Sequence, residues 1–282
     1  MPILKNNLLI TSYGIDSALS QILYYHHTST TNFITISRTK ASEAIEYLNP
    51  NIVINLGEDW DNVTIFNRSS TLSATNQLAT YLNVDKAIMK YAILSDKLLQ
   101  YNEELEPVVN FYEAVGHDNF VNRFIITDSL TLTKSEIALG KAFVIEHQHI
   151  AKEYVDNFLF YKDGIAIIKS NFKLGKYLEE AIIDKYAEDG LKLVCTYSSF
   201  NVDSFGLRFK AKKDLKEKLL NNIDPNIISN EDLGSLIIAG INDHQEDAEE
   251  YYYEVLSEAW DKMVEEDKRK VFDEYDKCIE LS

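Results

Sequence analysis

Several features that would assign this sequence to a common class of protein are missing from it. No apolar run approaches the roughly 20 residues that cross a bilayer, so we expect no membrane association. P-loop and Gly-x-Gly-x-x-Gly sequences are absent, and no serine stands in a Gly-x-Ser-x-Gly context. The two cysteines, Cys195 and Cys278, fit no metal or redox spacing, which is typical of free thiols in a reducing cytoplasm. We therefore expect a cytoplasmic protein whose N-terminal segment forms the first strand and is no signal peptide.

Positive charge is also scarce. The chain has 28 Lys and Arg residues against 45 Asp and Glu, a net charge of −17, and five of the basic residues are arginines. A generally basic, phosphate-tracking surface is thereby excluded, although a local basic groove is compatible with this composition. Arginine is the best bidentate ligand for phosphate, so few residues are available for binding it.

The 282 residues, 45% of them apolar, can build two ordinary domains. The first part alternates short apolar runs with helical periodicity, which predicts a parallel sheet flanked by helices. We expect strands over 8–11, 33–37, 51–56 and 62–66 and helices over 15–25, 39–47 and 70–82, the last capped by Ser70 or Thr71. Ligands of such folds bind beyond the carboxyl ends of the strands, which places residues 12–16, 57–61 and 67–70 along one rim.

Beyond residue 84 the pattern is mostly helical to about 154, with an interruption near 119–128. A hairpin with a Lys-Asp-Gly turn is expected over 158–170. After it we expect a helix over 174–186, strands over 191–197 and 205–210, and a short helix over 214–221. We expect an α/β domain with a helical connector over 1–150, a smaller α/β domain over 156–244, and an acidic helical extension over 245–282.

The extension carries 14 acidic and five basic residues, a difference of nine that makes up about half of the net charge. Val255, Leu256, Ala259 and Met263 form an apolar stripe along it. One interpretation is a solvated helix packed on the core. The other is a face that binds a protein partner or mimics nucleic acid.

Four segments carry a family resemblance: residues 11–17 (Thr-Ser-Tyr-Gly-Ile-Asp-Ser), 53–57 (Val-Ile-Asn-Leu-Gly), 63–75 (strand, Asn-Arg-Ser, then a Ser/Thr-rich helix start) and 98–102 (Leu-Leu-Gln-Tyr-Asn). In order and spacing they resemble the motifs of the DHH phosphoesterases, over about residues 5–250. That family includes exopolyphosphatases, RecJ-type nucleases, oligoribonucleases and cyclic-dinucleotide phosphodiesterases. It pairs a parallel-sheet domain that holds two manganese ions with a smaller substrate domain.

The resemblance implies a degenerate metal site. Asp16 keeps its family position, whereas Ser12 stands at the histidine and Gly14 at the first aspartate of that motif. Asn55 and Asn102 stand near two further aspartates, and Asn67-Arg68-Ser69 replaces the name-giving Asp-His-His. Asparagine lacks the charge that a divalent pair requires, so we expect no metal cofactor. A rebuilt site would use Asp16 with Glu58, Asp59 and Asp61, and would hold manganese.

The second domain carries a similar pattern. Phe205 to Lys210 keeps Arg208 where a family arginine contacts substrate, and residues 238–248 keep His244 of a glycine-rich loop whose glycines are gone. The resemblance thus implies a protein that binds without hydrolysing. Its ligand would be a nucleotide or phosphorylated molecule in the inter-domain cleft, held by Arg68, Arg208, His244, Asn67 and Asn102. A protein partner on the acidic helices is another expectation. Two alternatives stay open: an active metal-dependent phosphoesterase with the rebuilt site, and an unrelated α/β protein.

Overall fold

A computed structural model gives the fold of two compact units, Met1–Val144 and Ile145–Ser282. The structure describes residues 8–57, 60–69, 71–100, 103–169, 174–201, 204–209, 218–219, 221–223, 228–232, 235–239, 248–263 and 265. In 197–201, 204–209, 228–232 and 235–239 it describes the backbone alone. One long helix, α7 (Lys134–Phe158), contains the division after Val144. The expected domain boundary, near residues 150–156, lies close to the end of the same helix. No helix of the described ranges has both the length and the apolar character required to cross a membrane.

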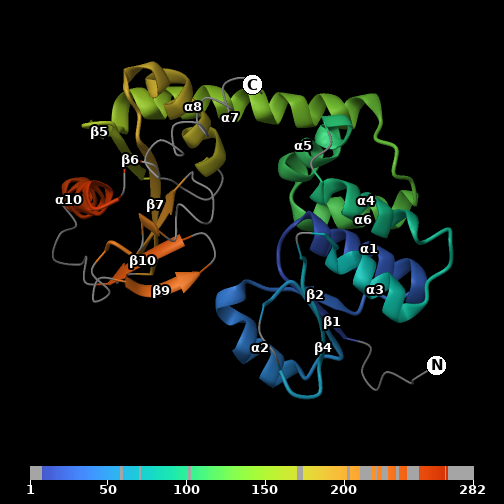
Figure 1. Ribbon diagram of the computed structural model, residues 1–282. Helices are drawn as coiled ribbons and strands as arrows, with labels where there is room; N and C mark the ends of the chain where they lie inside the picture. The colour runs from blue at the N-terminus through green and yellow to red at the C-terminus, as the bar shows by residue number, and fades with distance from the viewer. Residues whose placement is uncertain are drawn as a thin grey trace. The chain divides into compact units, whose positions relative to one another are not determined.

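The first unit is built on the predicted parallel sheet. Strands β1 (Leu9–Thr11), β2 (Phe33–Thr35), β3 (Ile52–Ile54) and β4 (Thr64–Phe66) pair in the order β2-β1-β3-β4, every pair parallel. The α/β class and the flanking helices are thereby confirmed (Figure 1). The carboxyl ends of β1, β3 and β4 meet at one edge, where Ser12 N donates to Ile54 O at 3.1 Å and Asn55 N to Phe66 O at 2.9 Å.

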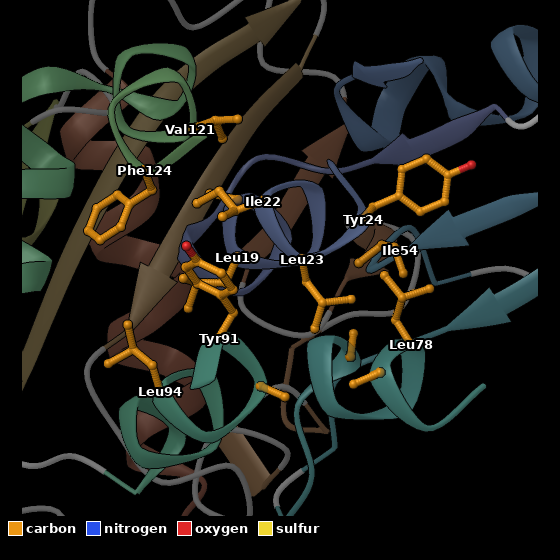
Figure 2. Close-up of a cluster of buried hydrophobic side chains, with 14 of the residues drawn as sticks. Leu19, Ile22, Leu23, Tyr24, Ile54, Leu78, Tyr91, Leu94, Val121 and Phe124 are labelled. Atoms are coloured by element: carbon orange, nitrogen blue, oxygen red, sulfur yellow. The ribbon is translucent and has the colours of Figure 1, made fainter. Parts of the chain in front are cut away.

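Side-chain alternation along the strands creates two cores. Leu9, Ile52 and Ile54 face a large cluster beneath α1 (Ile15–Thr28), α3 (Ala74–Leu82), α4 (Lys90–Leu99), α5 (Glu106–Val115) and α6 (His117–Thr127). Figure 2 shows Leu19, Leu23 and Tyr91 of this cluster packed together. Ile10 and Val53 face the other side, where α2 (Ala41–Leu48) contributes Ala41 and Ile45. Both faces of the sheet are therefore covered, as expected for parallel strands.

Two sequence predictions in this unit are wrong in detail. Helix α3 begins at Ala74, because the hydroxyl of Ser73 accepts a hydrogen bond from Asn76 N at 3.1 Å and caps the helix. Thr71 lies before this cap, and Ser70 lies outside the described ranges. The expected interruption near 119–128 is helix α6, whose Phe120, Val121 and Phe124 are buried. The break comes later, at Asp128, which closes α6 in a left-handed conformation.

The second unit contains a six-stranded sheet in the order β5-β6-β7-β8-β10-β9. The predicted hairpin is confirmed: β5 (Phe160–Lys162) and β6 (Ile165–Lys169) pair antiparallel across Asp163 and Gly164, both with positive φ. Strands β7 (Leu193–Asn201), β8 (Ser204–Phe209), β9 (Ile228–Asp232) and β10 (Ser235–Ala239) complete it. Helix α8 (Gly175–Tyr186) packs on β7. Of the predicted helix over 214–221, residues 214–217 and 220 lie outside the described ranges.

The start of the acidic extension is a packed helix, α10 (Ala248–Asp261). It contacts β6, and Tyr252, Leu256, Ala259 and Trp260 are buried. Two further contacts reach the end of β5 and the hairpin turn: Lys162 Nζ lies 2.6 Å from Glu250 Oε1, and Tyr253 OH donates to Asp163 Oδ2. The apolar stripe of the described helix is thus used inside the second unit, which agrees with the packed interpretation.

Candidate functional site

The carboxylate of Asp16 lies at the carboxyl edge of the sheet, in the first turn of α1, with the residue only 6% exposed. Its Oδ2 accepts from Asn55 Nδ2 at 2.9 Å and from Ala74 N at 3.0 Å. Its Oδ1 accepts from Thr75 N at 3.1 Å, Thr75 Oγ1 at 2.5 Å and Ser95 Oγ at 2.7 Å. A carboxylate offers about four lone-pair sites, so five donors saturate it.

Asp16 also caps the helix that faces it. The first N–H groups of a helix have no partner within the helix. In α3, those of Ala74 and Thr75 donate to Asp16, and that of Asn76 donates to the Ser73 hydroxyl. Because Asp16 stands at the N-terminal ends of both α1 and α3, two helix dipoles favour its negative charge. The protein's own carboxylate therefore occupies the position at which α3 could bind an anion.

Asn55 ties this carboxylate to the neighbouring loops. It follows β3 in a left-handed conformation, with φ 57°, which asparagine tolerates better than most residues. Its Oδ1 accepts from Arg68 N at 2.8 Å, and its Nδ2 faces both Asp16 and the Ser17 hydroxyl, which is 3.2 Å away. The Arg68 N–H fixes the orientation of the amide, because only oxygen can accept there. Asn55 thus supplies a donor where the family resemblance implies a carboxylate.

The other two substituted positions of the first motif are also engaged in hydrogen bonds. The hydroxyls of Ser12 and Ser17 lie 3.1 Å apart, and both residues are buried. Gly14 precedes α1 with φ 132°, and its N–H donates to the hydroxyl of Tyr112 at 3.0 Å. A side chain at Gly14 would be strained by that conformation, which favours glycine.

Sequence reasoning missed three contributors to this site. Thr75 and Ser95 donate directly to Asp16. Asp96 supports the start of α3: it accepts hydrogen bonds from Ser73 N at 3.0 Å, from Ser73 Oγ at 2.6 Å and from the Asn76 amide. The hydroxyl-rich sequence from Ser73 to Thr75 signals a helix start. No pattern in the sequence indicates that Ser95, in the interior of α4, reaches the carboxylate of Asp16.

The remaining predicted site residues lie at the sheet edge, in an exposed turn, on β8 or outside the described ranges. Asn67 and Arg68 follow β4 on the expected edge; Asn67 is half-buried and accepts from Gly57 N at 3.1 Å, while Arg68 is exposed. Asp61 is exposed in the turn before β4. Arg208 lies on β8, where only the backbone is described. The other predicted residues lie outside the described ranges: Glu58, Asp59, Asn102 and His244.

The described residues do not fit a two-manganese centre. Divalent ions of this kind require several anionic oxygens or imidazoles at one place. Here Asp16 is saturated by donors, and the neighbouring family positions hold an amide, a hydroxyl and a glycine. Across the described ranges, no three His, Cys, Asp or Glu side chains gather in a way that could hold a metal ion.

Comparison with solved structures identifies the architecture. The chain is similar to the pGpG-specific phosphodiesterase PggH from Vibrio cholerae, with a TM-score of 0.51 and 10% identity, over 92% of this chain and all of that one. It is also similar to RecJ from Thermus thermophilus in complex with Mn²⁺, with a TM-score of 0.51 and 8% identity, over 91% of this chain. The chain has a DHH-like fold.

This DHH-like fold confirms the resemblance seen in the four sequence segments. The chain spans 52% of the length of RecJ, so much of that protein has no counterpart here. No protein-family model and no curated protein matches the sequence. At 8–10% identity the likeness concerns the fold alone.

Proposed function

We propose that this chain is a catalytically degenerate DHH-like protein, which binds a nucleotide or another phosphorylated ligand without hydrolysing it. The saturation of Asp16 by five donors carries the proposal. In a two-metal phosphoesterase, carboxylates must turn their lone pairs to the ions that activate water and neutralise the phosphoryl charge. Asp16 instead holds the ends of α3 and β3 together, so the hydrolytic machinery has no anchor.

Binding of an anion is supported by the edge that remains around this residue. Arg68 is exposed beside the carboxyl end of β4, and its guanidinium forms no ion pair with another described residue. Its backbone is fixed by Asn55, and the adjacent Asn67 braces Gly57. A free guanidinium can bind phosphate through two parallel charged hydrogen bonds. Arg208, His244 and Asn102 stay predicted contacts to the same ligand, and a protein partner on the acidic helices stays a separate prediction.

The first probe is pGpG, the substrate in the name of PggH, with a short oligonucleotide as the second. We expect saturable binding of at least one of them by calorimetry, and no hydrolysis of either in the presence of Mn²⁺ by chromatography. Arg68→Gln should weaken binding about tenfold or more, since it removes a charged hydrogen bond. Arg38→Gln, at another exposed arginine, is the matched control and should bind as the unmodified protein does.

Each result distinguishes between the functions. Mn²⁺-dependent hydrolysis that Asp16→Ala abolishes would establish the alternative, an active phosphoesterase with a rebuilt site, and would overturn the proposal. Absence of binding to both probes would refute a nucleotide ligand and leave the fold as a protein-binding scaffold.

A further inference from the structure

A pocket of about 350 Å³ opens in the first unit on the side of β1 away from β3. Tyr13 and Phe33 supply aromatic walls, Gln21 and Thr35 a polar floor, and Asp118 and Asn122 a polar rim. The volume lies in the range of small-molecule sites, about 300–1,000 Å³. Neither Asn67 nor Arg68, the proposed phosphate-binding residues whose side chains the structure describes, lines this pocket, so the two sites are argued from different residues.

The floor is fixed by a chain of buried hydrogen bonds. Gln21 is 1% exposed, and its Nε2 donates to Thr11 Oγ1 at 2.7 Å and to Thr35 Oγ1 at 2.8 Å. Its Oε1 lies 3.2 Å from His117 Nε2. The Gln21 side chain is therefore held with both amide protons engaged, and the ring of Tyr13 packs edge-on against His117 at 5.7 Å. A preformed floor lowers the entropic cost of binding.

The rim has unused capacity to accept hydrogen bonds. Asp118 and Asn122 stand four residues apart on α6, so they lie on one face of the helix. Neither makes a hydrogen bond or ion pair with another residue of the described ranges, and both line the pocket. Among the described lining residues, Asp118 alone carries a charge. An anion would be repelled here, whereas a cation would gain from the carboxylate.

We propose that this pocket binds a small organic cation with N–H donors, an amine or a guanidinium. The Asp118 carboxylate would accept a charged hydrogen bond, and the Asn122 amide oxygen would accept a second one. The faces of Tyr13 and Phe33 would add cation–π attraction, which is the general device by which proteins hold ammonium groups. Together these four side chains make the pocket selective for positive charge.

The test is a titration of the full chain with agmatine, monitored by calorimetry and by ¹H–¹⁵N NMR. We expect saturable one-to-one binding at moderate salt, with amide shifts concentrated at Tyr13, Phe33 and Asn122. Succinate, an anion of similar size, should give no such shifts. Because the whole protein is acidic, non-specific accumulation of cations must be separated from binding in the pocket.

Two variants make that separation. Asp118→Asn keeps the shape of the side chain, and we expect it to weaken agmatine binding at least tenfold. Glu46→Gln removes the same charge from an exposed position on α2 and should leave binding unchanged. Circular dichroism verifies that both variants fold. The proposal is overturned if agmatine fails to bind, if Asp118→Asn and Glu46→Gln bind it alike, or if succinate produces the same shifts.

Discussion

Asn55 Nδ2 donates a hydrogen bond to Asp16 Oδ2 over 2.9 Å, joining the end of β3 to the first turn of α1. The other end of the same amide accepts from the backbone of Arg68, after β4. One neutral side chain therefore links three segments of the sheet edge. Two carboxylates at this separation would require a metal ion or a shared proton between them. With an amide, the edge is held together by protein atoms alone.

The first prediction concerns that amide. Asn55→Asp should lower the free energy of unfolding by roughly 2–4 kcal/mol at neutral pH, because it removes a donor and sets a second charge against Asp16. Urea unfolding, monitored by circular dichroism, measures this decrease in the free energy of unfolding. Asn67→Asp is the control: among the described residues the Asn67 side chain accepts from Gly57 N and donates to none, so the replacement should lower the free energy of unfolding by no more than about 1 kcal/mol. Equal stability of Asn55→Asp and the unmodified protein would contradict this account of the edge.

The second prediction concerns Asp16 itself. Asp16→Asn should destabilise the metal-free protein by roughly 2–4 kcal/mol, since the buried donors of Ala74, Thr75 and Ser95 then share one oxygen and meet an N–H₂ group. Asp61→Asn, at an exposed turn, should change stability by no more than about 0.5 kcal/mol. If Asp16 were a metal ligand, removing its charge would not destabilise the metal-free protein. A structural role for Asp16 is therefore contradicted if metal-free Asp16→Asn is as stable as the unmodified protein or more stable.

The sequence predicted the parallel sheet because strictly apolar runs such as Ile52–Ile54 alternate with helical periodicity, a local signal. It also predicted the edge on which Asp16, Asn67 and Arg68 lie, because parallel strands end together. Asn55 was expected inside the third strand, which ends one residue before it, at Ile54. The partners of Asp16 escaped prediction since Thr75 and Ser95 reach it over separations of 59 and 79 residues. Only tertiary packing of α3 and α4 brings them there, and no pattern in one sequence records it.

The third prediction follows from His117, whose burial lowers its pKa below the ordinary value of 6.5, while Asp118 opposes the shift. The unfolded chain then binds a proton at a higher pH than the folded one. Stability is therefore fully present above about pH 6.5 and declines as the pH falls toward the folded pKa. Unfolding by urea between about pH 7.5 and pH 5.5 should show this slope. His117→Gln should reduce it, whereas His149→Gln, at an exposed histidine of α7, should leave it unchanged.

The fourth prediction concerns the junction of α6 and α7. Arg123 Nε donates to Glu136 Oε1 at 2.7 Å, and Glu136 exchanges hydrogen bonds with Thr133 in a capping box. These donors lower the pKa of Glu136 to about 2 from its ordinary 4.5. The stabilisation is present above about pH 4.5 and is lost as the pH falls toward 2. Glu136→Gln should cost roughly 1–3 kcal/mol at neutral pH in the same urea assay.

A matched control for Glu136 lies in the same helix. Glu153 is exposed and pairs with His149 four residues earlier, so Glu153→Gln should change stability by less than about 0.5 kcal/mol. If Glu136→Gln lowers the free energy of unfolding as little as Glu153→Gln does, the capping box and the Arg123 contact contribute no measurable stability, and the prediction is wrong.

Whether Asp16 can hold a metal ion is tested by a calorimetric titration of the metal-stripped protein with Mn²⁺, beside the Asp16→Ala variant. We expect only the weak, unsaturable uptake of Mn²⁺ by an acidic surface, the same for both proteins, because the five donors leave Asp16 no lone pair for a metal. Tight binding near two equivalents that Asp16→Ala reduces would contradict this expectation, and would give the chain the metal site that the alternative, an active phosphoesterase, requires.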